Sequence, residues 1–348
     1  MAILPIIIDK QFNKLAVIDT YKSLIWTTRY YEHGDFELQL PANAKNVSLL
    51  TTGSYIVRTD DENVGIIEKV DVKISETNER LIIVSGRFLT AILARRIIAV
   101  QTQLTGSVSA AVEELIDDAI INPDIASRAI NNFIIEPYTI SSNIDVQYTG
   151  KNLYEVISDL ALQYHFGFKI TLNDSNQFVF SLFEGTDRSY NQSSNPYVIF
   201  SDEYENLINA EFQKDIKGMV TAVLAAGEGE GLDRKTIWVE SEEAPSGINR
   251  FELYDDSRNT SSNDGEISEA DYYKQLAEDG RAFLTAYEST FAGEVNFNNI
   301  KFKEDINIGD IVTIESKALG YKMAARIIEV IESVDASGAY QVIPTFGK

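Results

Sequence analysis

The chain has 348 residues, 44% of them hydrophobic, and a formal net charge of −23 from 53 acidic and 30 basic residues. This length allows two or three domains, and the hydrophobic content is that of a folded chain. The acidic excess excludes a general nucleic-acid-binding surface and disfavours docking on anionic lipid, since both need clustered lysine and arginine. The absence of cysteine excludes disulfides, thiolate catalysis and the common zinc sites.

The first residues predict a strand rather than an export signal. The apolar run from Ile3 to Ile8 is short and has no basic segment before it. No stretch of the chain approaches the roughly 20 apolar residues that a membrane helix needs. We therefore expect a soluble chain.

Residues 1–98 predict a first antiparallel β-barrel, because short segments rich in β-branched and aromatic residues follow one another without a helix between them. The stretch "SLIWTTRYYEHGDFELQLPANA" (23–44) alternates in period two on both sides of Gly34. It could be a catalytic hairpin, a surface-binding hairpin or barrel wall, and we interpret it as wall. Helical spacing begins in "RFLTAILARRII" (87–98), so a short helix is expected to leave the barrel there.

Residues 99–200 predict an α+β middle domain. Apolar stripes at helical spacing indicate helices at about 107–121 and 152–165. A capping box begins the second helix, and a glycine is expected to stop it. Two alternating segments then predict a hairpin over 167–183.

The remainder predicts a second β-barrel formed by residues 201–240 together with 290–348. Residues 241–289 are expected to be an insertion into this barrel. It would consist of a mobile acidic loop (241–267) and a helix (268–288), since the loop is rich in Ser, Asn and Asp. The fold class expected from the whole chain is therefore β-rich α+β, with two similar antiparallel barrels and helix-containing α+β domains.

The segments 53–74 and 309–334 share one plan. Each has a glycine, a polar residue, a short strand of Ile and Val, a polar turn and a strand carrying Ile-Ile-Glu. In our alignment, Ile66-Ile67-Glu68-Lys69-Val70 matches Ile327-Ile328-Glu329-Val330. The similarity has two explanations, which are chance likeness between hairpins and two copies of one barrel.

Catalytic signatures are weak. His33 lies in an expected turn and His165 at an expected helix end, and no G-x-S-x-G motif accompanies these two histidines. The carboxylates are numerous enough for a glycosidase-like pair, but without a cleft signature we interpret most of them as solvated. These observations favour a protein without catalytic residues, cofactor or metal.

Two further motifs have ordinary explanations. "AAGEGEGLDRK" (225–235) imitates a phosphate loop, but it lacks the Gly-Lys-Ser/Thr ending and its glutamates would repel phosphate. We interpret it as a tight strand connection. "DDSRNTSSNDGE" (255–266) hints at calcium, yet Gly265 does not fall at the sixth position of an EF-hand loop.

Two groups of side chains are candidates for contacts. Arg87, Arg95 and Arg96 form a local basic group that fits either a subunit interface or intrachain salt bridges. Tyr30 and Tyr31 could be sugar platforms. Adjacent strand residues point to opposite faces, however, so we expect at least one of the two to pack inside.

The stretches "LIWTTRYYEHGDFELQLPA", "VGIIEKVDV" and "VSGRFLTAILARRII" resemble the opening of siphophage tail proteins of the baseplate-hub, or tail-tip, family. Later, "AAGEGEGLDR", "INIGDIVTI" and "IPTFG" resemble the second half of the same family. The residues that carry the resemblance form a framework motif: Trp26, Tyr30, Gly34, Phe36, Leu38, Leu40, Pro41, Gly65, Ile66, Ile67, Ser85, Gly86, Arg87, Leu89, Arg95, Arg96, Gly309 and Asp310.

The resemblance implies a fold like the trimeric hub of contractile-phage tails, in which each subunit carries two similar β-barrels. Three subunits would then present six barrels to a hexameric ring of distal tail proteins. It further implies a role in closing or gating the tail channel, through which DNA passes without tight binding. The implied partners are a second and third copy, the distal ring, the tape-measure protein and receptor-binding or fibre proteins. The implied location is the distal end of the virion tail, after assembly in the host cytoplasm.

Two other functions stay open. Longer relatives, such as tail-associated lysins, carry peptidase, muramidase or receptor-binding regions after this structural region. Because the chain reaches Lys348 directly after an expected strand, we expect cell-wall degradation to require another polypeptide. The alternatives are therefore a cell-wall hydrolase, supported only by abundant carboxylates, and a carbohydrate-binding receptor module, supported by tyrosine-rich loops.

Overall fold

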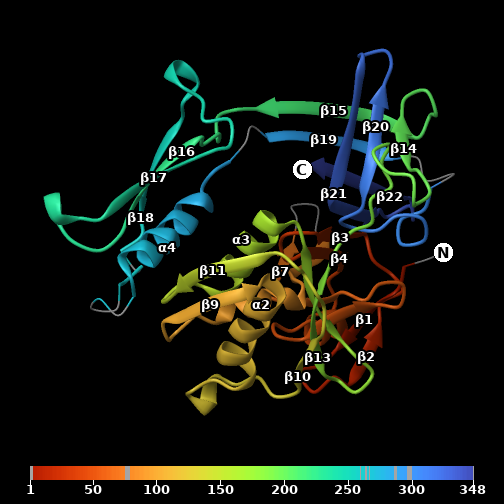
Figure 1. Cartoon of the computed structure of the whole chain (residues 1–348). Helices are drawn as coiled ribbons and strands as arrows, with labels where there is room; N and C mark the ends of the chain where they lie inside the picture. Colours follow the sequence, from red (N-terminus) through yellow and green to blue (C-terminus); the bar gives the residue numbers. More distant parts are fainter. Residues whose placement is uncertain are drawn as a thin grey trace.

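A computed structural model describes residues 3–347 except 75–78, 259, 263–264, 266, 286–287 and 296–299. It is β-rich, with several sheets and few helices (Figure 1). The N-terminal and C-terminal strands lie next to each other, while the helices belong mainly to the middle of the chain.

The N-terminal strands form two sheets around one core. The first sheet has four strands, in the order β2 (Lys14–Val17), β1 (Pro5–Ile8), β5 (Tyr55–Arg58) and β6 (Val64–Ile66). Facing it are β3 (Ser23–Arg29), β4 (Asp35–Pro41), β8 (Arg80–Arg87) and β7 (Lys69–Ile74), and α1 (Ala44–Leu49) follows β4. Alternation along β3 and β4 turns Leu24, Trp26, Phe36, Leu38 and Leu40 inward. The opening hairpin is therefore a wall of this core.

One sheet joins both ends of the chain. Its ten strands include β3, β4, β8 and β7 together with β14 (Ile199–Ser201), β15 (Leu207–Asp215), β19 (Glu288–Val295), β20 (Ile311–Ser316), β21 (Tyr321–Val334) and β22 (Tyr340–Gly347). The link is the antiparallel pairing of β3 with β21, in which Thr28 lies opposite Val330.

The strand pairings of the described residues close no barrel, so the two expected barrels are not confirmed. Within the described ranges, an isolated bridge between Gly65 and Phe88 connects the two N-terminal sheets. The strand β3, which could have closed a barrel, instead pairs with β21 of the other half. Some pairs are also parallel rather than antiparallel, including β14 with β20. The part of the fold prediction that holds is a β-rich chain with several sheets.

The middle of the chain packs two helices against short strands. Its elements are η1 (Leu89–Arg95), β9 (Thr102–Ser107), α2 (Val108–Ile116), the π turn η2 (Asp117–Ile121), η3 (Ala126–Arg128), β10 (Phe133–Glu136), β11 (Asn143–Tyr148), α3 (Leu153–Tyr164), β12 (Gly167–Leu172) and β13 (Phe178–Phe183). The Asn152 side chain caps α3 by accepting from Tyr154 N and Glu155 N. The helix ends at Tyr164, and its C-cap His165, rather than Gly167, takes the left-handed conformation with a φ of 60°.

The strands between residues 222 and 256 do not belong to the large sheet. β16 (Ala222–Ala226) and β17 (Thr236–Glu240) pair with β18 (Glu252–Asp256) in a separate three-stranded sheet. The short helices η4 (Gly231–Asp233) and η5 (Gly247–Asn249) lie in its loops, and α4 (Glu269–Arg281) packs against it. We call β16, β17, β18 and α4 the lateral module. It projects from the body; β15 and β19 lead to it, and α4 also packs against β11 of the body (Figure 1).

The insertion predicted at 241–289 is therefore part of the lateral module. The expected acidic loop contains η5 and β18, and part of it lies outside the described residues. The helix predicted over 268–288 ends at Arg281, because Phe283 and Leu284 already lie in a turn and an irregular segment. Tyr287, near the end of the predicted helix, lies outside the described residues.

The similar segments 53–74 and 309–334 form two equivalent corners. In the N-terminal corner, Gly53 N donates to Ile67 O (2.7 Å) and Ile67 N donates to Ser54 O (2.8 Å). In the C-terminal corner, Gly309 N donates to Ile327 O (2.8 Å) and Ile327 N donates to Asp310 O (2.9 Å). Both glycines are left-handed, with φ of 85° and 89°.

The structural match of the corners differs by one residue from the sequence alignment. By hydrogen bonding Ile67 corresponds to Ile327, whereas the alignment paired Ile66 with Ile327. The register of β21 shifts between Ile327 and Glu329, which is a β-bulge containing Ile328. This bulge lets both glutamates keep an arginine partner on a neighbouring strand: Glu68 pairs with Arg87 and Glu329 with Arg29.

Candidate functional site

Tyr30 connects three parts of the chain. It follows β3, and its ring is fully buried. Its hydroxyl donates to the carbonyl of His165 (3.0 Å) and accepts from the N–H of Gly185 (3.3 Å), both in the middle of the chain. Its own N–H donates to the carbonyl of Ile328 (3.0 Å) in the C-terminal corner. Burial raises the pKa of Tyr30 to about 12, so the phenol stays protonated and can donate.

Glycines allow the three parts to meet at this tyrosine. A Cβ on Gly309 would overlap the ring of Tyr30, and a Cβ on Gly185 would overlap the carbonyl of Gly309. A Cβ on Gly167 would lie 2.6 Å from Cε2 of Tyr30. Each position therefore excludes a side chain, because backbone and ring approach too closely. We call this region, with Tyr30, Gly185, Gly309 and Asp310, the junction.

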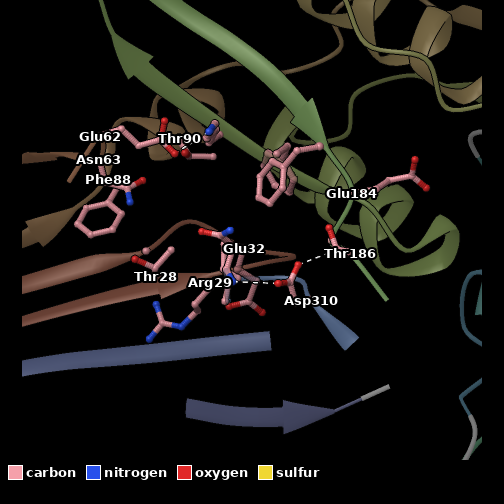
Figure 2. A pocket seen from close by; sticks show the side chains of 17 residues that line it. Thr28, Arg29, Glu32, Glu62, Asn63, Phe88, Thr90, Glu184, Thr186 and Asp310 are labelled. Carbon is pink, nitrogen blue, oxygen red and sulfur yellow. Dashed lines mark hydrogen bonds and ion pairs between the residues drawn. The ribbon is translucent and has the colours of Figure 1, made fainter. Parts of the chain in front are cut away.

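Asp310 fastens the junction from the C-terminal side. Its side chain is almost fully buried, and its carboxylate accepts from Thr186 N (2.7 Å), Arg188 Nε (2.9 Å) and Asn307 N (3.1 Å). Figure 2 shows the bond between Thr186 and Asp310. Because each oxygen has partners, the charge of Asp310 is compensated and the segment after β13 is held to the C-terminal corner.

A cavity of about 270 Å³ opens beside the junction (Figure 2). Its walls come from the N-terminal hairpin, the middle of the chain and the C-terminal loop before β20, and they are mostly polar: Thr28, Arg29, Glu32, Glu62, Asn63, Thr90, Lys169, Glu184, Thr186, Asn307 and Asp310. Both of its cations are paired within the chain, Arg29 with Asp35 and Glu329, and Lys169 with Glu62. The cavity can therefore hold water or small polar groups, but its described lining residues offer no free cation for an anionic substrate.

The remaining framework residues lie mainly in the N-terminal core. The ring of Trp26 packs against Phe36 and Phe88, with centroids 5.9 and 4.6 Å apart. Cβ atoms at Gly34 and Gly65 would meet Phe88 and Phe36 respectively, and one at Gly86 would overlap the carbonyl of Ile66. Leu40 is buried, Pro41 is the exposed end of β4, and Ser85 O accepts from Glu68 N. The framework motif thus holds this core and the junction together.

The three arginines proposed for a subunit interface have partners inside the chain. Arg87 donates to both carboxylate oxygens of Glu68, at 2.7 and 2.8 Å, and Arg95 lies 3.9 Å from the same carboxylate. Arg96 donates to the carbonyls of Arg128 and Arg95. Their role in an interface between subunits stays a prediction.

The two histidines have packing roles. The ring of His33 stacks on Tyr154 with centroids 4.9 Å apart, and burial, assisted by Arg87, lowers its pKa. Nδ1 of His165 lies 3.4 Å from the hydroxyl of Tyr31, and burial lowers its pKa as well. Within the described part of the chain, these ring contacts do not assemble a Ser-His-Asp arrangement.

The glycine-rich motif connects β16 and β17. Gly227 N and Lys235 N donate to the carbonyls of Lys235 and Glu228, which closes the connection. The hydrogen bond from Lys235 Nζ (2.7 Å) lowers the pKa of Glu228 to about 2. Among the described residues, no cluster of three or more carboxylate or imidazole side chains could hold a metal ion. Nor is any helix in the described ranges long and apolar enough to cross a membrane.

The sequence did not reveal a buried ionic cluster between the two halves. Arg58 is fully buried and pairs with Asp60 (2.6 Å) and Glu332 (3.0 Å), while Lys303 pairs with Glu332 (2.8 Å) and Asp61. The guanidinium also lies 5.4 Å from the centroid of Trp26. Since Glu332 is 274 residues from Arg58, no local pattern indicated this contact.

Comparisons with known proteins agree with this architecture. The model of the family described as Siphovirus ReqiPepy6 Gp37-like protein matches residues 4–348. No curated protein matches the chain significantly.

Three of the similar solved structures are tail proteins. The tail protein from Neisseria meningitidis MC58 is 14% identical, with a TM-score of 0.59 over 100% of this chain and 97% of that one. The 43 kDa tail protein of prophage MuSo2 from Shewanella oneidensis is 15% identical, with a TM-score of 0.59 over 99% and 98%. Prophage tail protein gp18 from Listeria monocytogenes EGD-e is 15% identical, with a TM-score of 0.56 over 99% and 94%. At these identities the similarity shows the fold alone. The chain therefore belongs to the Siphovirus ReqiPepy6 Gp37-like family and has the fold of phage tail proteins, which confirms the resemblance found in its sequence.

Proposed function

We propose that the chain is a structural subunit of a phage tail tip, a trimeric hub that docks under the hexameric ring of distal tail proteins. In this role it closes or gates the tail channel at the distal end of the virion and links the tail to host-recognition parts. The family and the fold support a structural rather than a catalytic role.

The observation that carries this proposal is the repeated corner. One chain contains the same arrangement of two backbone hydrogen bonds twice, at Gly53–Ile67 and at Gly309–Ile327. A ring of three such chains would present six equivalent corners, which is the number that a sixfold partner requires. The β3–β21 pairing fixes the two corners relative to each other, so that both could meet the partner at once.

The charge supports passage of DNA through such a ring. With 53 acidic and 30 basic residues, a channel lined by this chain would repel phosphate rather than bind it. Partners beyond the distal ring would include the tape-measure protein and receptor-binding or fibre proteins, after assembly in the host cytoplasm.

The test is the mass and symmetry of the purified chain. Light scattering of the chain alone should give about three times 38.9 kDa, or the chain should assemble with the hexameric distal ring into complexes whose electron-microscopy class averages are threefold. A chain that stays monomeric in the presence of that ring would contradict the proposal of a trimeric hub. Zymography on peptidoglycan provides the second measurement, because lysis by this chain alone would favour a hydrolase instead.

A further inference from the structure

The sheet of the lateral module has two different faces. Helix α4 packs on the face that carries Ala225 and Val239, since a Cβ on Gly280 of α4 would lie 3.2 Å from the Ala225 Cβ and 3.0 Å from Val239. Side chains alternate along strands, so Leu224, Trp238 and Tyr254 point to the opposite face. The exposed fractions of Trp238 (47%) and Tyr254 (55%) agree with that direction.

These three side chains form one row across the sheet. Leu224 on the central strand lies opposite Trp238 on β17 and opposite Tyr254 on β18. The two aromatic side chains are therefore two strand spacings apart, about 9.6 Å. The neighbouring positions of β16 on this face, Ala222 and Ala226, are fully buried, whereas Leu224 is partly exposed, so the open part of the face is the row itself, which we call the platform.

Arginines hold both rings in place. The Arg250 guanidinium lies 5.0 Å from the Trp238 centroid and donates to Glu240 (2.5 Å) and Glu252 (2.6 Å). At the other end, Arg234 donates to the hydroxyl of Tyr254 (2.7 Å) and pairs with Asp256. The platform is thus preorganised, with an apolar centre and hydrogen-bonding groups on both sides.

Charge and area indicate what can bind here. The arginines at the platform (Arg234, Arg250 and Arg258) are paired with an equal number of carboxylates (Glu240, Glu252 and Asp256), so the face is locally neutral in a strongly acidic chain. A nucleic acid would need unpaired cations. Three strands of five residues cover on the order of 200 Å², far less than the ~800 Å² per partner of a stable protein interface.

We propose that this platform binds an uncharged glycan. Sugar rings would stack their C–H faces on Trp238 and Tyr254, with Leu224 beneath the part of the glycan between them. Their hydroxyls would bond to the guanidinium and carboxylate groups at both ends, which offer donors and acceptors. The module projects from the body (Figure 1), so a surface polysaccharide could reach it. This site is independent of the oligomeric state proposed above.

Tryptophan fluorescence tests the proposal directly, because the chain has only two tryptophans and Trp26 is fully buried. Iodide quenching therefore reports on Trp238. We expect maltohexaose, cellohexaose, mannohexaose or N-acetylchitohexaose, each titrated to 10 mM, to reduce the quenching of the full chain at least about twofold. Failure of all four sugars to protect Trp238 would overturn the proposal.

Variants test whether glycan binding depends on stacking against the aromatic rings. In native gels containing the corresponding soluble polysaccharide, Trp238→Ala and Tyr254→Ala should lose at least tenfold in affinity, while Tyr254→Phe should stay within about threefold of the wild type. Tyr204→Ala is the matched control, because Tyr204 is 62% exposed outside the platform. Equal retardation of Trp238→Ala and wild type would contradict the site. A change in the mass of the assembly, with unchanged retardation, would make the face a contact between copies instead.

Discussion

The two corners have the same hydrogen bonds but different surroundings. At the N-terminal corner, a Cβ on Gly53 would lie 2.6 Å from Cε of Lys10, the far end of a flexible side chain. At the C-terminal corner, a Cβ on Gly309 would overlap the ring of Tyr30, which two hydrogen bonds hold in place. One local structure thus serves as a simple turn in the first half and as part of the junction in the second.

The same contrast extends to the ion pairs. Glu68 and Arg87 pair within the N-terminal strands, whereas Glu329 and Arg29 connect β21 to β3 and so hold the two halves together. Arg29 also pairs with Asp35 and donates to the carbonyl of His33. A repeated backbone geometry is thus kept while its side-chain partners change from local to long-range.

Gly309→Ala should have the largest effect. A left-handed alanine is strained, and its Cβ must also displace the Tyr30 ring, so we expect a loss of about 3 kcal/mol in the free energy of unfolding. Thermal denaturation followed by circular dichroism measures it. A shift no larger than that of Gly53→Ala would show that the C-terminal corner is not packed against the junction.

Arg29→Ala should cost about 2 kcal/mol, because it leaves Glu329 and Asp35 without their shared partner. Arg87→Ala, its match at the other corner, should cost roughly 1 kcal/mol, since the pair with Glu68 is more exposed. Urea denaturation of both variants compares the two. Equal urea midpoints for the two variants would mean that the ion pairs of Arg29, which connect the two halves, add no more stability than the local pair of Arg87 with Glu68.

Gly53→Ala should cost about 1 kcal/mol from backbone strain alone, because the Lys10 chain can move aside. The double variant Gly53→Ala with Lys10→Ala serves as the control. If removing the lysine side chain restored stability, steric contact rather than the left-handed φ would be the cause.

The pH dependence of the Glu68 pair should be the smallest effect. The hydrogen bonds from Arg87 hold the pKa of Glu68 below its ordinary value. A lowered folded pKa gives stability that is complete above pH ~4.5 and is lost as the pH falls through the folded value. The stability difference between wild type and Glu68→Gln should therefore shrink by less than about 1 kcal/mol between pH 6 and pH 3, measured by urea denaturation. A stability difference that stays the same from pH 6 to pH 3 would show that the ion pair of Glu68 with Arg87 does not stabilise the fold.

The sequence allowed a fair part of the site to be located. Tyr30, Gly309 and Asp310 belong to the framework motif, and all three meet at the junction. Gly185 was missed because it lies in an irregular segment whose importance comes only from its contact with Gly309. The aromatic platform was missed for a similar reason, since Trp238 and Tyr254 become neighbours only through the central strand β16.

Local patterns determined the elements themselves. Period-two alternation defined the β3–β4 hairpin, and apolar stripes with a polar cap located α2 and α3, because these signals arise from residues a few positions apart. Tertiary structure alone decided that β3 pairs with β21 and that β16 and β17 form a sheet apart from the large one. It also decided that the C-terminal corner contains a one-residue bulge that the N-terminal corner lacks. Every strand edge offers the same backbone donors and acceptors. Which edges pair therefore depends on the burial of side chains from the whole chain, and no short stretch of sequence contains that information.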